Sequence, residues 1–327
     1  MATIYDVAKR AKVSTYTVSS VLNRSAYVSP ELTMRVQQAV RELDYTINDL
    51  ARSLQTRRTR TIGMLIPDIA NPFYAKVVRA AEERLKRDGY SLILGNTYND
   101  EAEQSRYLGV FRSKQVDGLL LFVSAGDEED ARKLVEARKP VVFVGRVPRT
   151  FEADTVTADN IRGSQLATEH LIGKGHKTIA LIPGQLALSA SSDRVAGWRR
   201  ALRKHKLPAP AGYVRDGDWT VESGRSATLS FLDLPQPPTA ILAANFLMMT
   251  GVLRALKERS ISCPRQVEVM SWDDSEWLDV FAPPVSTVAT PSAEMGERAA
   301  DLLLKRMRHP ARKFERISLP SELHIRG

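Results

Sequence analysis

The sequence predicts a small all-α head followed by a larger α/β domain of two lobes, each built on a doubly wound parallel sheet. Three observations support this fold class. Residues 1–46 hold three short amphipathic segments and no strand-like run. From residue 61 onward, continuous apolar runs alternate with amphipathic stretches, which is typical of parallel sheets covered by helices on both faces. The alternation repeats on either side of about residue 160, which predicts two lobes.

The first helix is expected to begin at Ile4. Thr3 with Asp6 three places on resembles a capping box, which satisfies free N–H groups at a helix start. The apolar residues that follow recur at i, i+3, i+4 and i+7 and therefore share one face: Ile4, Val7, Ala8 and Ala11.

A second helix follows closely, because Ser14 can cap it. Val18, Val21 and Leu22 are expected to face inward. The side chains left to project outward are Thr15, Tyr16, Thr17, Ser19 and Ser20. Short or planar hydrogen-bonding groups at the start of a helix suit base edges in the major groove. The pair therefore indicates a DNA-reading helix-turn-helix, although an ordinary helical hairpin with a solvated face would show the same pattern.

A third helix is predicted after Ser29, which can cap it, with Pro30 at the first helical position. Its apolar stripe lets three helices share one core: Val36, Ala39, Val40 and Leu43. A helix-prone stretch and then a basic run follow. We therefore expect a helix-turn-helix domain over residues 1–46 and a hinge helix with linker over residues 47–60.

The remaining chain, residues 61–327, is expected to form the two-lobed domain. Strands are predicted at residues 61–66, 90–94, 117–122, 140–144, 154–158, 178–182, 239–244 and 267–272. Helices are predicted near residues 72–88, 100–114, 127–138, 160–174, 192–206, 220–232, 246–259 and 293–308. The segment Ser286–Pro291 is interpreted as a return to the first lobe. Lobe one then comprises about 61–159 and 290–318, and lobe two about 160–289 and 319–327.

Charge and composition narrow the function class. Residues 1–60 carry +5 of the chain's formal net charge of +9, which fits a polyanionic partner bound at one end. The single cysteine, Cys263, rules out an intrachain disulfide. No signal peptide precedes Tyr5 and no apolar run approaches a membrane span. We expect a cytoplasmic protein without a membrane partner.

Catalytic and cofactor motifs are missing from the sequence. No GxGxxG, GxxxxGK[ST] or GxSxG pattern occurs, so loops for dinucleotides, triphosphates or a hydrolase nucleophile are lacking. The five histidines are scattered and no set of metal ligands forms around them. We predict no enzyme activity, no catalytic residues, no metal and no cofactor.

The chain resembles the lactose/galactose repressor (LacI/GalR-type) family along nearly its whole length. The segments that carry the resemblance include IYDVAKRAKVSTYTVSSVLN, ARSLQT, TIGMLIPDIANPFYAKVV, DGLLLF, HLIGKGHKTIALIPG, DRVAGWRRAL, PTAILAAN, SWDD and PPVSTV. The resemblance implies a repressor that binds a near-palindromic double-stranded DNA operator as a homodimer. It also implies a hinge helix ordered on DNA, and a sensor domain like the periplasmic sugar-binding proteins that binds an effector and dimerises.

The residues expected to contact DNA combine the outward face of the second helix with positions implied by the resemblance. They are Thr3, Tyr5, Ser14, Thr15, Tyr16, Thr17, Ser19, Ser20, Asn23, Arg24, Asn48, Arg52, Leu54, Arg57 and Arg58. Ser20 stands where the family often has Arg, which removes a guanine reader. Leu54 corresponds to the residue that wedges into the minor groove.

The effector site is expected beyond the carboxyl ends of the strands, where open parallel folds bind ligands. Its expected residues are Phe73, Tyr74, Gly145, Arg194, Trp219, Asn245 and Asp273, of which Arg194 and Trp219 rest on the resemblance. Carboxylate, amide, guanidinium and indole groups suit a sugar or sugar derivative.

At two positions where the family usually has a polar residue for the effector, this chain has Gly145 and Phe246. Trp272 and Trp277 add aromatic bulk. The alternatives left open are therefore a regulator whose cleft is filled and takes no effector, a small-molecule binding module without regulation, and, less favoured, an α/β enzyme.

Overall fold

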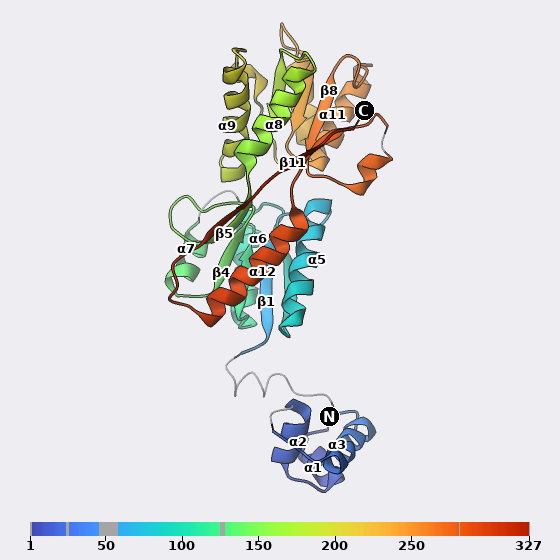
Figure 1. Ribbon diagram of the computed structural model, residues 1–327, viewed down its shortest axis with the longest axis vertical. Helices are drawn as coiled ribbons and strands as arrows, with labels where there is room; N and C mark the ends of the chain where they lie inside the picture. The colour runs from blue at the N-terminus through green and yellow to red at the C-terminus, as the bar shows by residue number, and fades with distance from the viewer. Residues whose placement is uncertain (1, 24–25, 46–57, 125–127, 281, 327) are drawn as a thin grey trace. The chain divides into compact units, whose positions relative to one another are not determined.

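A computed structural model describes residues 2–23, 26–45, 58–124, 128–280 and 282–326. The chain forms two compact units, Met1–Thr59 and Arg60–Gly327 (Figure 1). We call the first unit the head and the second unit the sensor domain, and describe each by itself. Among the described residues, no helix has the length and apolarity needed to cross a membrane.

The head consists of α1 (Ile4–Ala11), α2 (Thr15–Asn23) and α3 (Pro30–Glu42). The expected capping box is present, with the Thr3 hydroxyl accepting from the Asp6 N–H and the Asp6 carboxylate accepting from the Thr3 N–H. Ser29 caps α3 through the Leu32 N–H. The three helices share one core, whose buried members are Val7, Ala8, Ala11, Val18, Val36 and Ala39.

Lobe one of the sensor domain contains a six-stranded parallel sheet in the order β10-β5-β4-β3-β1-β2. Its strands are β1 (Thr61–Ile66), β2 (Ser91–Asn96), β3 (Gly118–Leu121), β4 (Val141–Val144), β5 (Asp154–Ala158) and β10 (Arg316–Leu319). Helices α5 (Pro72–Arg87) and α12 (Ser292–Arg308) cover one face, and α6 (Glu101–Ser113) and α7 (Glu129–Glu136) cover the other (Figure 1). Successive residues of β1, such as Met64 and Leu65, enter different cores, because successive side chains of a strand point to opposite faces.

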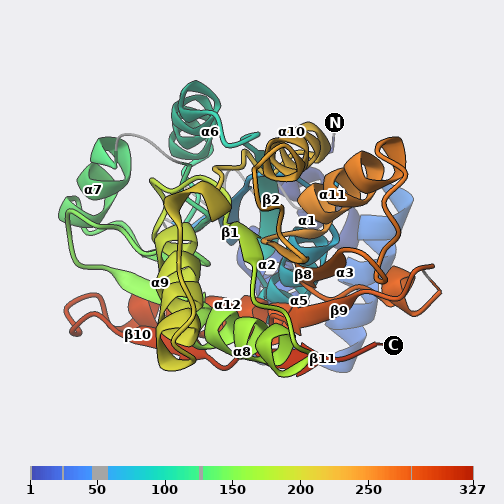
Figure 2. The same ribbon diagram turned by 90° about the horizontal axis from the view of Figure 1, so that it is seen from above.

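Lobe two contains a five-stranded sheet in the order β11-β9-β8-β7-β6. Its strands are β6 (Ile179–Ile182), β7 (Ala240–Ala243), β8 (Glu268–Trp272), β9 (Ser286–Ala289) and β11 (Glu322–His324). Its α-helices are α8 (Asn160–Gly173), α9 (Ser189–Lys204), α10 (Val221–Leu232) and α11 (Phe246–Glu258), with short 3-10 turns at Ala211–Tyr213 and Glu276–Asp279. Figure 2 shows α8 beside β11.

The fold class predicted from the sequence is confirmed, with two local differences. The segment Ser286–Pro291, interpreted as a crossing, begins as strand β9 paired with β8. Strand β11 was not predicted, and it pairs antiparallel with β9. It is short and its side chains are mostly exposed, so it carries no apolar pattern that a sequence can reveal.

The chain passes between the lobes at three places. They are the steps from β5 to α8, from β9 to α12, and from β10 to β11. The lobes therefore share three connections, and a cleft between them can change width without unfolding either sheet.

Candidate functional site

Helix α2 of the head presents a polar surface whose geometry is fixed at its start. The Ser14 hydroxyl accepts from the Thr17 N–H at 3.1 Å and bonds the Thr17 hydroxyl at 2.9 Å. Tyr16 then stands 73% exposed, and Tyr5 of α1 is 74% exposed. These side chains stand at the start of a capped helix, where hydrogen-bonding groups suit base edges in the major groove, so this face of the head is the candidate nucleic-acid interface.

The turn between α1 and α2 is held from α3. Lys12 ends α1 in the left-handed conformation, at φ 52°. The Arg35 guanidinium donates to the carbonyls of Ala11 at 2.6 Å and of Lys12 at 3.2 Å. These bonds satisfy carbonyls that a helix end leaves free, and they fix the angle at which α2 leaves the turn.

The structure corrects one predicted DNA contact. Ser20 is 2% exposed, so the expectation that it projects outward is wrong. A serine hydroxyl stands one bond from Cβ and extends little beyond the helix backbone, so neighbouring groups can cover it. Thr15, Thr17 and Ser19 are partly exposed.

The other predicted DNA contacts divide into two groups. Thr3 and Ser14 act as helix caps, and Arg58 is exposed. The side chain of Asn23 lies outside the described part of the chain, as do Arg24, Asn48, Arg52, Leu54 and Arg57.

A cavity of about 50 Å³ lies between the two lobes of the sensor domain. All seven predicted effector residues line it: Phe73, Tyr74, Gly145, Arg194, Trp219, Asn245 and Asp273. The other lining residues are Asn71, Phe122, Arg146, Ala158, Asn160, Ala190, Ala244, Thr290 and Met295. The rule that ligands bind beyond strand ends therefore leads to one real cavity.

Arg194 of α9 is the central cation of this cavity. Its Nε donates to Asn160 Oδ1 at 3.0 Å, and its Nη1 donates to the Ala244 carbonyl at 3.1 Å. The guanidinium also lies 4.4 Å from the centre of the Trp272 ring. Burial lowers the pKa of Arg194 to about 10. The group remains charged at neutral pH, and its position is fixed by neutral partners.

Asp273 follows β8 and lies across from Arg194. Its backbone adopts φ 65°, and its N–H donates to the Val288 carbonyl at 3.0 Å. Burial raises the pKa of this carboxyl to about 6, although Arg194 acts in the opposite direction. The carboxyl can therefore act as donor or acceptor close to neutral pH.

Trp219 forms an aromatic wall of the cavity. Its backbone also adopts a positive φ, at 73°, and its indole packs against Gly184, where a Cβ would lie closer than 3.0 Å to the ring. The guanidinium groups of Arg146 and Arg194 lie 5.7 and 5.6 Å from the ring centre. The buried indole N–H has no partner among the described residues, which leaves it available to a ligand.

Asn245 is engaged within the protein. Its Oδ1 caps α11 by accepting from the Met248 N–H at 2.7 Å, and its Nδ2 donates to the Trp219 carbonyl at 3.1 Å. One amide hydrogen is left for a ligand. Positioning the Trp219 segment is therefore part of what Asn245 does.

The residues suspected of filling the cleft do not line it. Phe246 packs against the core of lobe two, and Trp272 is a fully buried core residue. Trp277 is 68% exposed. The aromatic bulk that narrows the cavity comes instead from Phe73, Tyr74, Phe122 and Trp219.

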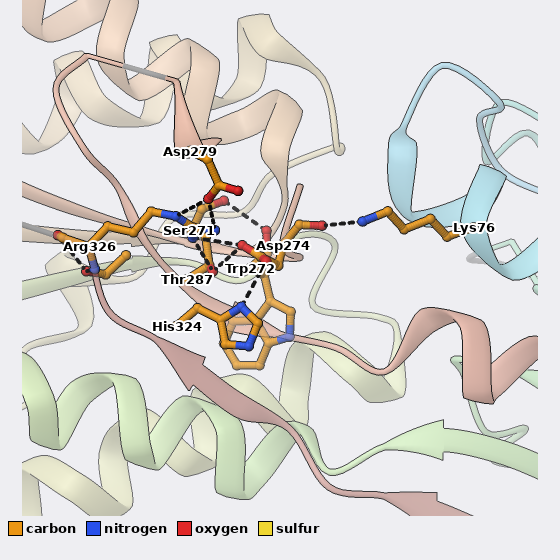
Figure 3. A network of polar contacts seen from close by, with 9 residues as sticks. Lys76, Ser271, Trp272, Asp274, Asp279, Thr287, His324 and Arg326 are labelled. Carbon is orange, nitrogen blue, oxygen red and sulfur yellow. Dashed lines mark hydrogen bonds and ion pairs between the residues drawn. The ribbon is translucent and has the colours of Figure 1, made fainter. Parts of the chain in front are cut away.

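A polar cluster around Asp274 joins the loop after β8 to strand β9 and to the C-terminal segment (Figure 3). Asp274 accepts from Thr287 and Arg326 and bonds His324, each at 2.8 Å. Burial alone would raise the pKa of Asp274, but the hydrogen bonds from Arg326, His324 and Thr287 lower it to about 2. The Asp274 carbonyl also accepts from Lys76 of lobe one at 3.3 Å. The cluster fixes β11 to the sheet and brings the lobes into contact.

Two family models match the chain. Residues 3–48 match "Bacterial regulatory proteins, lacI family", and residues 168–327 match "Periplasmic binding protein-like domain". The first match spans the head and the second lies in the sensor domain.

Curated relatives match over the full length. The ribose operon repressor of Escherichia coli is 37% identical over 100% of this chain and 99% of its own length. The HTH-type transcriptional repressor PurR of Vibrio atlanticus is 35% identical over 96% of both chains.

Solved structures agree. A Lac repressor dimer bound to operator and the anti-inducer ONPF superimposes with a TM-score of 0.87 at 29% identity, over 98% of this chain and 97% of the other. The transcriptional regulator CelR in complex with cellobiose gives a TM-score of 0.76 at 32% identity, over 99% of both chains.

Proposed function

Since the chain belongs to the lacI family of bacterial regulatory proteins, we propose that it represses transcription as a homodimer on a near-palindromic operator. It is a transcriptional repressor with a small-molecule effector rather than an enzyme. The effector is proposed to bind between the lobes through Arg194, Trp219 and Asp273, and to be a sugar or sugar derivative.

One observation carries this proposal: the ribose operon repressor of Escherichia coli matches head and sensor domain together, over the whole chain. A small-molecule binding module without regulation would not need a capped helix pair exposing Tyr5 and Tyr16. Phe246 and Trp272, whose bulk suggested a filled cleft, do not line the cavity. We further propose that residues 47–60 form the hinge and that residues 61–327 hold the effector and dimer contacts.

The size of the cavity bears on how an effector acts. The cavity is small, at about 50 Å³, and aromatic side chains line it. We propose that entry of a sugar separates the lobes, and that the lobes then close around it. Such a rotation changes the spacing of the two chains that lead to the heads, and with it the affinity for DNA.

The test is sequence selection by the purified full-length protein from a random pool of duplex DNA, followed by binding measurements on the selected site. The proposal expects two inverted half-sites about one helical turn, ~34–36 Å, apart. Tyr16→Ala should lose roughly 1–3 kcal/mol on the selected site and little on random DNA.

Lys9→Ala, which removes an exposed cation of α1 that we have not assigned to base reading, is the matched control. This substitution should weaken binding to the selected site and to random DNA equally, or leave both unchanged. Equal losses on selected and random DNA for Tyr16→Ala would contradict base reading by that residue. No enrichment of any sequence would contradict the repressor proposal itself.

A further inference from the structure

We propose that the effector is an anion, a small oxygen-rich acid whose carboxylate or phosphate group binds between Arg146 and Arg194. This inference rests on the proposed function, since it concerns the same cavity. It assigns to Arg146 the role of selecting charged ligands over neutral sugars.

Arg146 is a buried cation with neutral partners. It is 5% exposed and lines the cavity. Its guanidinium donates to the Val123 carbonyl and to Asn99 Oδ1, the latter at 2.9 Å. Among the described residues no carboxylate forms an ion pair with it. A guanidinium has five N–H donors, and these two bonds with the one to Tyr74 leave two for a ligand.

The charges that line the cavity are not balanced. Two guanidinium groups line it, whereas Asp273 is the only lining carboxylate in the described part of the chain. Arg194 has Asp273 and Asp193 as acidic neighbours. The titratable group that interacts electrostatically with Arg146 is Tyr74. Tyr74 in turn interacts with the Asp68 carboxylate. Lys76 is a further cation near Asp273.

A buried cation without an opposite charge is costly in free energy. Burial lowers the pKa of both arginines and raises that of Asp273, which shows that the site disfavours isolated charge. The two cations also repel each other, and both lie beside the Trp219 ring. An anion between them would relieve both effects, and a guanidinium binds carboxylate or phosphate through two parallel bonds.

The protein cannot place its own carboxylate at the neighbouring position. Gly145 adopts φ +72°, a conformation that L side chains rarely take, and a Cβ there would lie 2.6 Å from Phe122. An aspartate in its place would be strained and would clash. A negative charge that pairs with Arg146 would therefore come from elsewhere, and the cavity is where a ligand can supply it.

The experiment measures binding of matched acidic and neutral compounds to the full-length protein by calorimetry and thermal shift, at constant ionic strength. The carboxylates are D-gluconate and D-galacturonate. The phosphates are D-glucose 6-phosphate and D-ribose 5-phosphate, with inorganic phosphate as the minimal anion. The neutral compounds are D-glucose, D-galactose and D-ribose. We expect at least one acid to bind ten or more times more tightly than its neutral parent, and the two acid arms distinguish carboxylate from phosphate.

Arg146→Gln should lower the affinity for the bound acid about ten- to a hundredfold, as expected for the loss of charge-assisted hydrogen bonds. It should change the affinity for neutral sugars little. Arg298→Gln is the control, because it removes the same charge from an exposed ion pair with Glu294 on α12 and should leave the acid affinity unchanged.

Three outcomes would overturn the inference. The first is a neutral sugar that binds as tightly as its acid. The second is an equal loss of acid affinity for Arg146→Gln and Arg298→Gln. The third is that none of these probes binds. In each case selection of an operator remains a separate measurement, so the repressor proposal fails only if specific DNA binding is absent.

Discussion

Two residues of the cleft, Trp219 and Asp273, hold left-handed backbone conformations at φ 73° and 65°. Each such conformation costs on the order of 1–3 kcal/mol and persists only where surrounding structure enforces it. Asn245 contributes to this enforcement by donating to the Trp219 carbonyl, and the Val288 carbonyl does so by accepting from the Asp273 N–H. The cleft is thus prearranged by groups that need not touch a ligand.

Gly184 is expected to be essential for the position of Trp219. Gly184→Ala combines a positive φ of 87° with a Cβ closer than 3.0 Å to the indole, so it should destabilise the protein by about 2–4 kcal/mol. Gly175→Ala is the matched control, because φ there is 99° but no atom lies within 4 Å of the Cβ. It should cost about 1–2 kcal/mol. Equal free energies of unfolding, measured in urea, would contradict the packing argument.

Asp274 is expected to make stability depend on acid. Its pKa is lowered from 3.8 to about 2 in the folded state, so its contribution is complete above the unfolded pKa and is lost as pH falls from about 4 toward 2. At neutral pH, Asp274→Asn should lose about 2 kcal/mol, and the variant should depend less on pH in that window.

The control for Asp274→Asn is Asp279→Asn. This substitution breaks the ion pair between Asp279 and Arg326, in which the Asp279 side chain is 65% exposed. It should lower the free energy of unfolding by less than about 1 kcal/mol. Urea unfolding between pH 2 and 7 compares the two variants. An unchanged pH profile for Asp274→Asn would show that the cluster does not stabilise the ionised carboxylate.

Among the elements, three helix pairs pack in direct backbone contact: α5 with α12, α8 with α9, and α10 with α11. In each pair a glycine lies at the crossing: Gly296, Gly197 and Gly251. A Cβ at any of these would lie closer than 3.0 Å to a carbonyl oxygen of the partner helix. Close approach lets the helices cover each sheet as one layer.

Gly296→Ala should separate α12 from α5, because its Cβ would meet the Val77 carbonyl. We expect a loss of about 2–4 kcal/mol, greater than the usual cost of overpacking, since backbone cannot rotate away as a side chain can. Gly109→Ala in the exposed part of α6 has no atom within 4 Å of the Cβ and should stabilise by about 0.5–1 kcal/mol. Thermal unfolding measures both, and a neutral Gly296→Ala would contradict this account of the packing.

The elements were predictable where local chemistry decides them. The eight predicted strands and eight predicted helices of the sensor domain are present with ends shifted by three residues or fewer. The capping box of Thr3 and Asp6 was equally local. Strand β11 was not predictable, because it depends on pairing with β9 and on Asp274, His324 and Arg326 from distant parts of the chain.

Part of the cleft was predictable because local sequence decides where its strands end. Residues directly after predicted strands, such as Asn245 and Asp273, line the cavity. Thr290 was missed because β9 before it was not recognised. Asn160, two residues after β5, could have been found by the same rule. The burial of Ser20 and the neutral surroundings of Arg146 are tertiary facts that no local pattern contains.

For the whole molecule, polar contacts join the two lobes of the sensor domain on both sides of the cavity. Lys76 donates to the Asp274 carbonyl at 3.3 Å on one side (Figure 3). On the other, the Val147 N–H donates to the Ser189 hydroxyl at 2.9 Å, and Arg149 donates to Ser192 at 3.0 Å. These bonds between described residues are individually weak, so a ligand with moderate differential affinity can shift the arrangement.

Ser189→Ala should therefore favour the open arrangement. Loss of one hydrogen bond, about 1 kcal/mol, corresponds to a roughly fivefold change in the opening equilibrium. Hydrogen exchange at the Val147 amide and in the segments that line the cavity should accelerate by that factor, while the strands of both sheets keep their protection. Ser105→Ala removes a hydroxyl bond to Asp130 within lobe one and should leave exchange in the cleft unchanged. If Ser189→Ala accelerated only Val147 itself, the bond would be a local one, and lobe closure would depend on the effector alone.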